Sequence, residues 1–83
     1  MINEEISGNT PSSETVSTMA VSDVVIEGVG TGQVFLECMV PGGKWVIVTN
    51  CTGAFSLDTA STDISYRFRP VSVDTPVRVY FGP

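Results

Sequence analysis

The chain has 83 residues, of which 42% are hydrophobic, nine are acidic, four are basic and none is histidine. This length allows one small domain, and the formal net charge of −5 disfavours binding to nucleic acid, whose phosphates an acidic protein repels. Without histidine the chain has neither the commonest general base nor a Ser/His or Cys/His nucleophile pair, so we expect that it is not an enzyme.

The first 20 residues differ in composition from the rest of the chain. They combine serine, glycine, asparagine and proline with three glutamates, and their apolar positions are scattered. A segment of this kind buries too little apolar surface to fold alone. We therefore expect residues 1–20 to be an extended or disordered acidic arm, with Ile2 and Ile6 as its docking points on a neighbour, and residues 21–83 to be the folded domain.

The N-terminus also bears on localisation. Met1 is followed by Asn3, Glu4 and Glu5, where a secretory signal needs a basic start and an apolar run. No apolar stretch is long enough to span a bilayer. We expect synthesis in the cytoplasm and no membrane partner.

From Val21 onward, short runs of β-branched and aromatic residues alternate with glycine, proline, asparagine or aspartate. This pattern is typical of a small antiparallel β-sandwich or barrel. No helical period appears. The sequence predicts six strands, at residues 21–27, 33–40, 44–50, 54–58, 64–71 and 77–82.

Two apolar runs flank residues 41–43, Pro-Gly-Gly, which predicts a central hairpin because glycine allows the positive φ angles of a tight turn. With the turn at Gly42–Gly43, Val40 faces Trp45 across the hairpin. The same register separates Cys38 from Cys51 by four residues, or about 13 Å, along the sheet. That distance exceeds disulfide geometry, so we expect free thiols.

A second hairpin is predicted from the last two strands, with its turn at residues 72–75. In this register Tyr66 faces Phe81 on the core side. On the other side Arg67 faces Tyr80 and Arg69 faces Arg78. The hairpin would therefore have one core face and one basic face.

The alternation also predicts which side chains face the core. These are Val24, Ile26, Val34, Leu36, Cys38, Val40, Trp45, Ile47, Phe55, Leu57, Ile64, Tyr66, Phe68, Val77, Val79 and Phe81. On the opposite face of the central hairpin lie Phe35, Met39, Val46 and Val48, an apolar surface that needs cover from another strand, the arm or another subunit.

Three short patterns are interpreted as turn or loop chemistry. Residues 27–32 have the wrong glycine spacing for a dinucleotide fingerprint, and residues 42–44 lack the rest of a phosphate-binding loop. The polar loop at residues 58–63 has fewer carboxylates than a calcium site usually uses. We expect no cofactor, no metal and no catalytic residues.

The basic face is the candidate binding site. Like charges opposite each other on a sheet are mildly destabilising unless an anion lies between them. A solvated outer face is one interpretation, and the other is that an acidic arm from a neighbouring copy or another protein lies there, with Tyr80 as an anchor. The expected partner-binding residues are Ile2, Glu4, Glu5, Ile6, Phe35, Arg67, Arg69, Arg78 and Tyr80.

Four short runs carry a family resemblance: Gly-Gln-Val-Phe-Leu-Glu at 32–37, Gly-Gly-Lys-Trp-Val at 42–46, Ser-Tyr-Arg-Phe-Arg at 65–69 and Val-Arg-Val-Tyr-Phe-Gly at 77–82. In this order they resemble the small β-sandwich virion proteins of tailed bacteriophages. The resemblance implies a capsid decoration or cement protein, present in many copies or as a homo-oligomer. Its partners would be other virion proteins such as the major capsid protein, and it would be assembled in the host cytoplasm.

Other functions stay open at this point. A tail or neck component is the nearest variant of the virion hypothesis. A cytoplasmic adaptor domain would bind a protein through an exposed sheet edge without entering a particle. A carbohydrate-binding sandwich would need exposed aromatic rings, for which Phe35, Trp45 and Tyr80 are the candidates.

Overall fold

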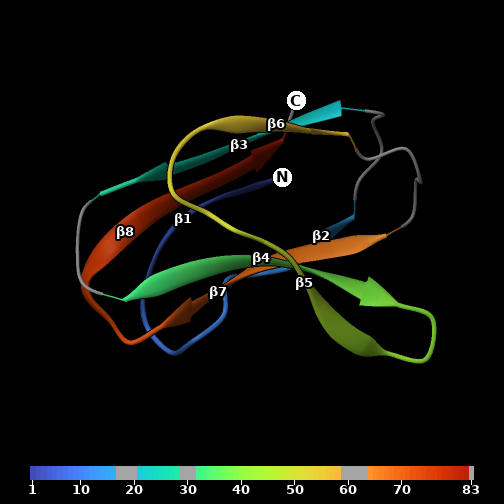
Figure 1. The fold of residues 1–83 in the computed structure, drawn as a ribbon, viewed down its shortest axis with the longest axis horizontal. Coiled ribbons are helices and arrows are strands. Elements are labelled where there is room, and N and C mark those ends of the chain that lie inside the picture. Colours follow the sequence, from blue (N-terminus) through green and yellow to red (C-terminus); the bar gives the residue numbers. More distant parts are fainter. Residues whose placement is uncertain (17–20, 29–31, 59–63, 83) are drawn as a thin grey trace.

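The computed structural model describes residues 1–16, 21–28, 32–58 and 64–82. In these residues eight strands form two antiparallel four-stranded sheets, packed as a sandwich (Figure 1). The first sheet has the order β1-β8-β3-β6 and the second has the order β2-β7-β4-β5. The strands are β1 (Ile2–Gly8), β2 (Thr15–Val16), β3 (Val21–Glu27), β4 (Gln33–Val40), β5 (Lys44–Asn50), β6 (Phe55–Asp58), β7 (Ser65–Val71) and β8 (Val73–Gly82).

The expected all-β class is confirmed, and so are the six strands expected after residue 20. The strands β3, β4 and β5 have the expected bounds, β6 and β7 begin one residue later, and β8 begins four residues earlier. The described residues include no helix suited to crossing a membrane.

The hydrophobic core lies between the two sheets. The first sheet contributes Val24, Val79 and Phe81, and the second contributes Leu36 and Phe68, all at most 2% exposed. The other buried apolar side chains of this cluster are Ile2, Ile6, Val34, Cys51, Tyr66, Val73 and Val77. Because both sheets supply large side chains, the core holds the two layers together.

Residues 2–8 belong to the sandwich. β1 pairs antiparallel with β8, with Ile2 opposite Phe81 and Ile6 opposite Val77. Ile2 and Ile6 are 1% and 6% exposed, because residues four apart in a strand lie on the same face. The segment was expected to be an arm that docks on a neighbour, because it buries too little apolar surface to fold alone, whereas it adds a strand to a sheet that the rest of the same chain builds.

The segment after β1 crosses to the second sheet. The backbone N–H of Ser12 donates to the carbonyl oxygen of Phe68, and the N–H of Phe68 donates to Ser12 Oγ, both at 2.9 Å. β2 then continues along β7. The expected arm is therefore wrong for residues 2–16, and residues 17–20 lie outside the described part of the chain.

The central hairpin is confirmed, but its register near the turn differs by one residue. Residues 41–43 form the turn, which places Trp45 opposite Met39 and not opposite Val40. A β-bulge farther along restores the expected register. Because side chains alternate between faces, the shift places Trp45 and Ile47 on the outer face of the sheet and not in the core.

The strands β7 and β8 follow each other in the chain but lie in different sheets, so the second predicted hairpin is wrong. The chain crosses between the sheets at Ser72, which has a φ of 55° and whose N–H donates to Asn9 Oδ1 at 2.9 Å. Gly32 packs against this crossing, since a Cβ there would lie 2.4 Å from the carbonyl oxygen of Ser72. The crossing thus requires glycine at position 32.

Candidate functional site

Five side chains from three strands gather on the outer face of the second sheet. In β7, Arg67 and Arg69 alternate with buried residues, so both point away from the core. On β4, Glu37 lies opposite Arg67 and Phe35 lies opposite Arg69. The shifted hairpin adds Trp45 from β5. We call these five residues the arginine face.

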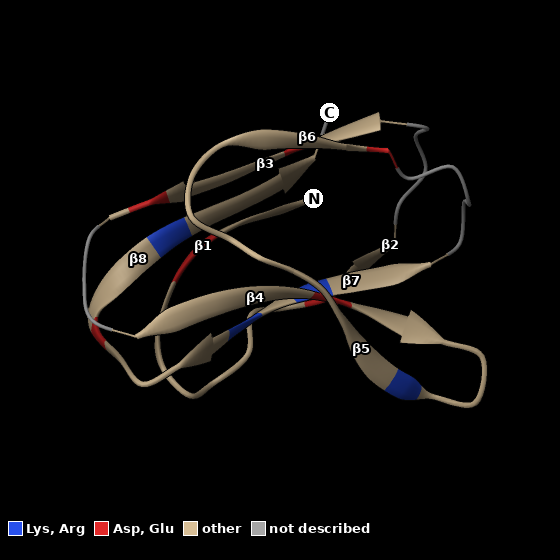
Figure 2. Ribbon diagram, in the orientation of Figure 1, with Lys and Arg blue, Asp and Glu red and all other residues tan. Residues whose placement is uncertain are grey.

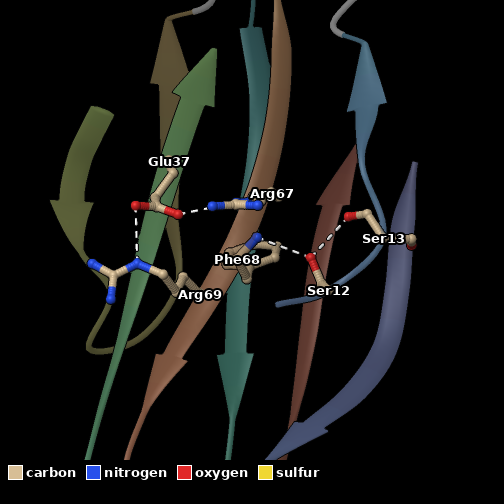
Figure 3. A network of polar contacts seen from close by, with 6 residues as sticks. All are labelled: Ser12, Ser13, Glu37, Arg67, Phe68 and Arg69. Carbon is tan, nitrogen blue, oxygen red and sulfur yellow. Dashed lines mark hydrogen bonds and ion pairs between the residues drawn. The ribbon is translucent and has the colours of Figure 1, made fainter. Parts of the chain in front are cut away.

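Glu37 is the centre of the arginine face. Its Oε1 accepts a hydrogen bond from Arg67 Nε and its Oε2 accepts one from Arg69 Nε, both at 3.0 Å (Figure 3). Glu37 is only 4% exposed, although it lies on the outer side of the sheet. A buried carboxylate is unfavourable unless it is paired, and two charge-assisted hydrogen bonds satisfy both of its oxygens.

Each guanidinium of the arginine face also stacks on an aromatic ring. The Cζ atom of Arg67 lies 4.2 Å from the ring centroid of Trp45, and that of Arg69 lies 5.3 Å from the centroid of Phe35. A cation–π contact of this kind contributes about 0.5–2 kcal/mol. The two guanidiniums are therefore fixed both by the shared carboxylate and by a ring.

The outer parts of both guanidiniums are open to solvent. The side chains of Arg67 and Arg69 are 21% and 33% exposed. Glu37 accepts hydrogen bonds from their Nε atoms, and their Nη amines make no hydrogen bond to the residues that the structure describes. A planar guanidinium with open Nη amines is suited to bind a carboxylate or another planar anion.

The arginine face is basic on an acidic chain. Its two arginines and one glutamate give a charge of +1, whereas the whole chain carries −5. Figure 2 shows the arginines of β7 beside the glutamate of β4, with acidic positions on β1 and β3 of the first sheet. The two layers thus differ in charge.

Arg78 and Tyr80 are not part of the arginine face. Both lie on β8 in the first sheet, so the expected common face with the two arginines of β7 is wrong. Arg78 Nε donates to Asn3 Oδ1 at 3.2 Å, and Arg78 Nη1 lies 3.7 Å from Glu5 Oε1. A separate hollow of about 320 Å³ is lined by Asn3, Val25, Glu27, Arg78 and Tyr80.

The other expected partner residues come from β1. Ile2 and Ile6 are core residues, so the prediction that they dock on a neighbour is wrong. The carboxylate of Glu4 accepts hydrogen bonds from the N–H and Oγ of Ser13, at 2.8 and 2.6 Å. The side chain of Glu5 is 63% exposed and presents its charge to solvent.

Sequence reasoning missed Glu37 and Trp45 as members of the site. The pairing of β4 with β7 brings Glu37 beside both arginines, although they are 30 and 32 residues away in the chain. Trp45 was expected in the core because of the hairpin register. The only local signal was the position of Glu37 between Phe35 and Met39, which marks an acidic residue on an otherwise apolar strand face.

The thiols and carboxylates give no indication of a metal or nucleophile site. Both cysteines are free, as expected, and burial raises the pKa of the Cys51 thiol to about 11, which keeps it protonated near neutral pH. Among the described residues there is no group of three or more histidine, cysteine, aspartate or glutamate side chains placed to hold a metal ion.

The arginine face is thus the main candidate binding site among the described residues. Comparisons of the chain with protein-family models, with curated proteins and with solved structures found no match.

Proposed function

We propose that the protein is a non-enzymatic structural protein that binds a larger protein assembly through the arginine face. The observation that carries the proposal is the pair of guanidiniums held between Glu37 and two aromatic rings with their Nη amines open. Arginine and tryptophan are enriched among the residues that dominate binding energy at protein interfaces. Side chains that are already ordered lose little entropy when a partner binds.

The chemistry of the face favours an acidic protein surface as the partner. The Nη amines of Arg67 and Arg69 offer paired donors for carboxylates, and the rings of Trp45 and Phe35 provide apolar contact area beside them. A net charge of −5 gives the chain no broad field that attracts a phosphate backbone. A protein partner with aspartate or glutamate at its surface therefore fits better than a nucleic acid.

The resemblance to small virion proteins of tailed bacteriophages gives this proposal its specific form. In that form the protein is a capsid decoration or cement protein, and the assembly is a phage shell built from the major capsid protein. A tail or neck component is the nearest alternative, and a cytoplasmic adaptor outside the particle is the second. The two virion forms use the arginine face, whereas the adaptor would bind its partner protein through an exposed sheet edge.

A variant that removes the charges of the face tests the proposal. Replacing the two arginines alone would leave Glu37 buried without a partner, so the variant combines Arg67→Gln, Arg69→Gln and Glu37→Gln. Arg78→Gln is the matched control, because it changes the net charge by the same −1 and lies on the other sheet. The triple variant should lose binding to the assembly, and the control should keep it.

The first measurement uses particles purified from a source that encodes the chain. Quantitative mass spectrometry should find the protein in many copies per particle. Co-sedimentation should show that the control stays with the particles and the triple variant does not. Absence from particles would contradict the virion form and favour the adaptor.

The second measurement tests the face without a native partner. Trp45 is the only tryptophan of the chain, so its fluorescence reports on the stacked Arg67. Titration with poly-glutamate should change this fluorescence in the wild type and in Arg78→Gln, and added salt should reverse the change. Equal binding by the triple variant, measured by calorimetry, would contradict an acidic partner at this face.

A further inference from the structure

Two strands of the sandwich have long free edges. Within the described residues β1 pairs only with β8 and β5 pairs only with β4, and each has seven residues. The other two outer strands are short, with two residues in β2 and four in β6. A long outer strand presents a row of backbone N–H and C=O groups that a further strand can pair with.

The β5 edge is apolar and locally basic. Ile47 and Val48 are 53% and 38% exposed, so two large apolar side chains of this strand are open to solvent. Lys44 is the charged residue of the strand. Arg67 adds a second cation here, because its guanidinium stacks on Trp45 of β5. Figure 1 shows the β4–β5 turn extending beyond the ends of the other described strands.

The β1 edge has the opposite charge. The strand carries two glutamates and no basic residue. The carboxylate of Glu4 is held by Ser13, and Glu5 is the more exposed of the two, with 63% of its side chain accessible. Its ion pair with Arg78 joins two largely exposed groups at 3.7 Å and is therefore weak.

Charge decides which edges can pair with each other. Two β1 edges would bring four glutamates together, and two β5 edges would bring two Lys44 side chains together, whereas Arg67 beside this edge is already paired with Glu37. Like charges across a strand pair are destabilising, whereas opposite charges favour pairing and fix its partner. The one complementary combination of these two edges is β1 with β5.

We propose that copies of this chain associate edge to edge, with β1 of one copy pairing with β5 of the next. The occupant of the β5 edge is therefore a second copy of the chain. Each contact joins two different edges, so it leaves one free β1 and one free β5 at the ends of every open oligomer. Repetition of such a contact forms a ring if it closes and a filament if it does not. The inference goes beyond the proposed function, because binding through the arginine face does not require it.

Sedimentation velocity of the full chain over a range of concentrations is the first test. The mass should rise with concentration at low salt and fall towards the monomer at high salt, because salt screens the contact between the two edges. Ile47→Glu should weaken association by at least about tenfold, since it adds an acid to the edge that receives the acidic strand. Val16→Glu is the control, because Val16 is 47% exposed on the opposite edge of the same sheet.

A mixing experiment tests the pairing of unlike edges. Glu5→Lys blocks β1 with a lysine, and Ile47→Glu blocks β5. Each variant alone should remain a monomer, because each has lost one of the two edges. A mixture should regain association, because the intact β1 of one variant can pair with the intact β5 of the other. Circular dichroism and thermal melts establish that both variants are folded.

Three results would overturn the proposal. A wild-type chain that stays monomeric at all concentrations and at low salt would exclude self-association. Dimers of Glu5→Lys alone would indicate pairing of β5 with itself. An equal loss of association in Val16→Glu and Ile47→Glu would exclude the β5 edge as the contact surface. None of these results bears on poly-glutamate binding by the arginine face, so the two proposals fail separately.

Discussion

Tyr66 and Phe81 stack their rings across the space between the two sheets, with centroids 4.9 Å apart and an interplanar angle of 25°. Tyr66 lies on β7 and Phe81 lies on β8, which are consecutive in the chain and belong to opposite layers. The ring pair is therefore a direct contact between the two sheets. Both residues are buried, at 6% and 2% exposure.

A double-mutant cycle should detect this ring pair as an energetic coupling. Phe81→Leu and Tyr66→Leu should each lower the free energy of unfolding, and the pair should show a coupling of about 0.5–1.5 kcal/mol. Urea denaturation of the wild type, both single variants and the double variant measures it. Strictly additive effects would mean that the rings contribute only their buried area.

Substitution of Gly32 should be far more damaging than substitution of Gly42. Both have a φ near +100°, so alanine is strained at either position, by about 1–2 kcal/mol. At position 32 the added Cβ would also meet the backbone of Ser72 at 2.4 Å, whereas nothing lies within 4 Å at position 42. Thermal melts should show that Gly42→Ala folds with a modest loss, and that Gly32→Ala loses at least about 2 kcal/mol more. Similar losses of stability in the two variants would contradict the close approach of Gly32 to the chain at Ser72.

Loss of the Ser12 hydroxyl should loosen the attachment of the N-terminal segment to β7. Ser12→Ala leaves the buried N–H of Phe68 without its acceptor, which costs about 1–3 kcal/mol. Hydrogen exchange followed by NMR should show faster exchange of the Phe68 amide. Ser13→Ala is the control: Ser13 is exposed, its own N–H still donates to Glu4, and it should leave that amide unchanged.

The stability of the protein should fall in alkali because of Cys51. Burial raises the pKa of this thiol from 9.0 to about 11, so above pH 9 the unfolded chain loses the proton while the folded chain keeps it. The unfolded state then binds fewer protons, and the free energy of unfolding decreases by up to about 1.4 kcal/mol per pH unit until about pH 11. Cys51→Ala should flatten this slope in urea titrations at several pH values.

Ionisation of Tyr66 should likewise lower the free energy of unfolding as the pH rises, at a higher pH than that of Cys51. Burial, and secondarily the charge of Cys38, raise the pKa of Tyr66 above its ordinary value of 10. Tyr66→Phe therefore separates the two contributions. If Cys51→Ala keeps the wild-type slope and Tyr66→Phe removes it, the thiol is not the group responsible.

Strand positions were predictable from the sequence because their signals are local. Alternation in residues 33–40 and 44–50, separated by Pro-Gly-Gly, is sufficient to locate β4, the turn and β5. The free cysteines were also predictable from approximate distances along the hairpin. These inferences depend on residues within a few positions of each other.

The strand register and the assignment of strands to sheets were harder to predict from the sequence, because they depend on parts of the chain that are distant in sequence. A one-residue difference at the turn moved Trp45 from the expected core to the arginine face. The positive φ of Ser72 sends β8 into the other sheet, so Arg78 is separated from Arg67 and Arg69. Composition of the first 20 residues suggested disorder, yet Ile2 and Ile6 complete the core.

The pairing of β1 with β8 also determines when the sandwich can form. Ile2 lies opposite Phe81, so β1 and β8 pair although most of the sequence lies between them. A ribosome makes residues 2–8 long before residues 73–82, and until then Ile2 and Ile6 have no strand beside them. Bringing together two strands that are so far apart in sequence is slow, as in other β proteins whose contacts mostly join distant parts of the chain. The complete sandwich therefore cannot form until synthesis has passed β8.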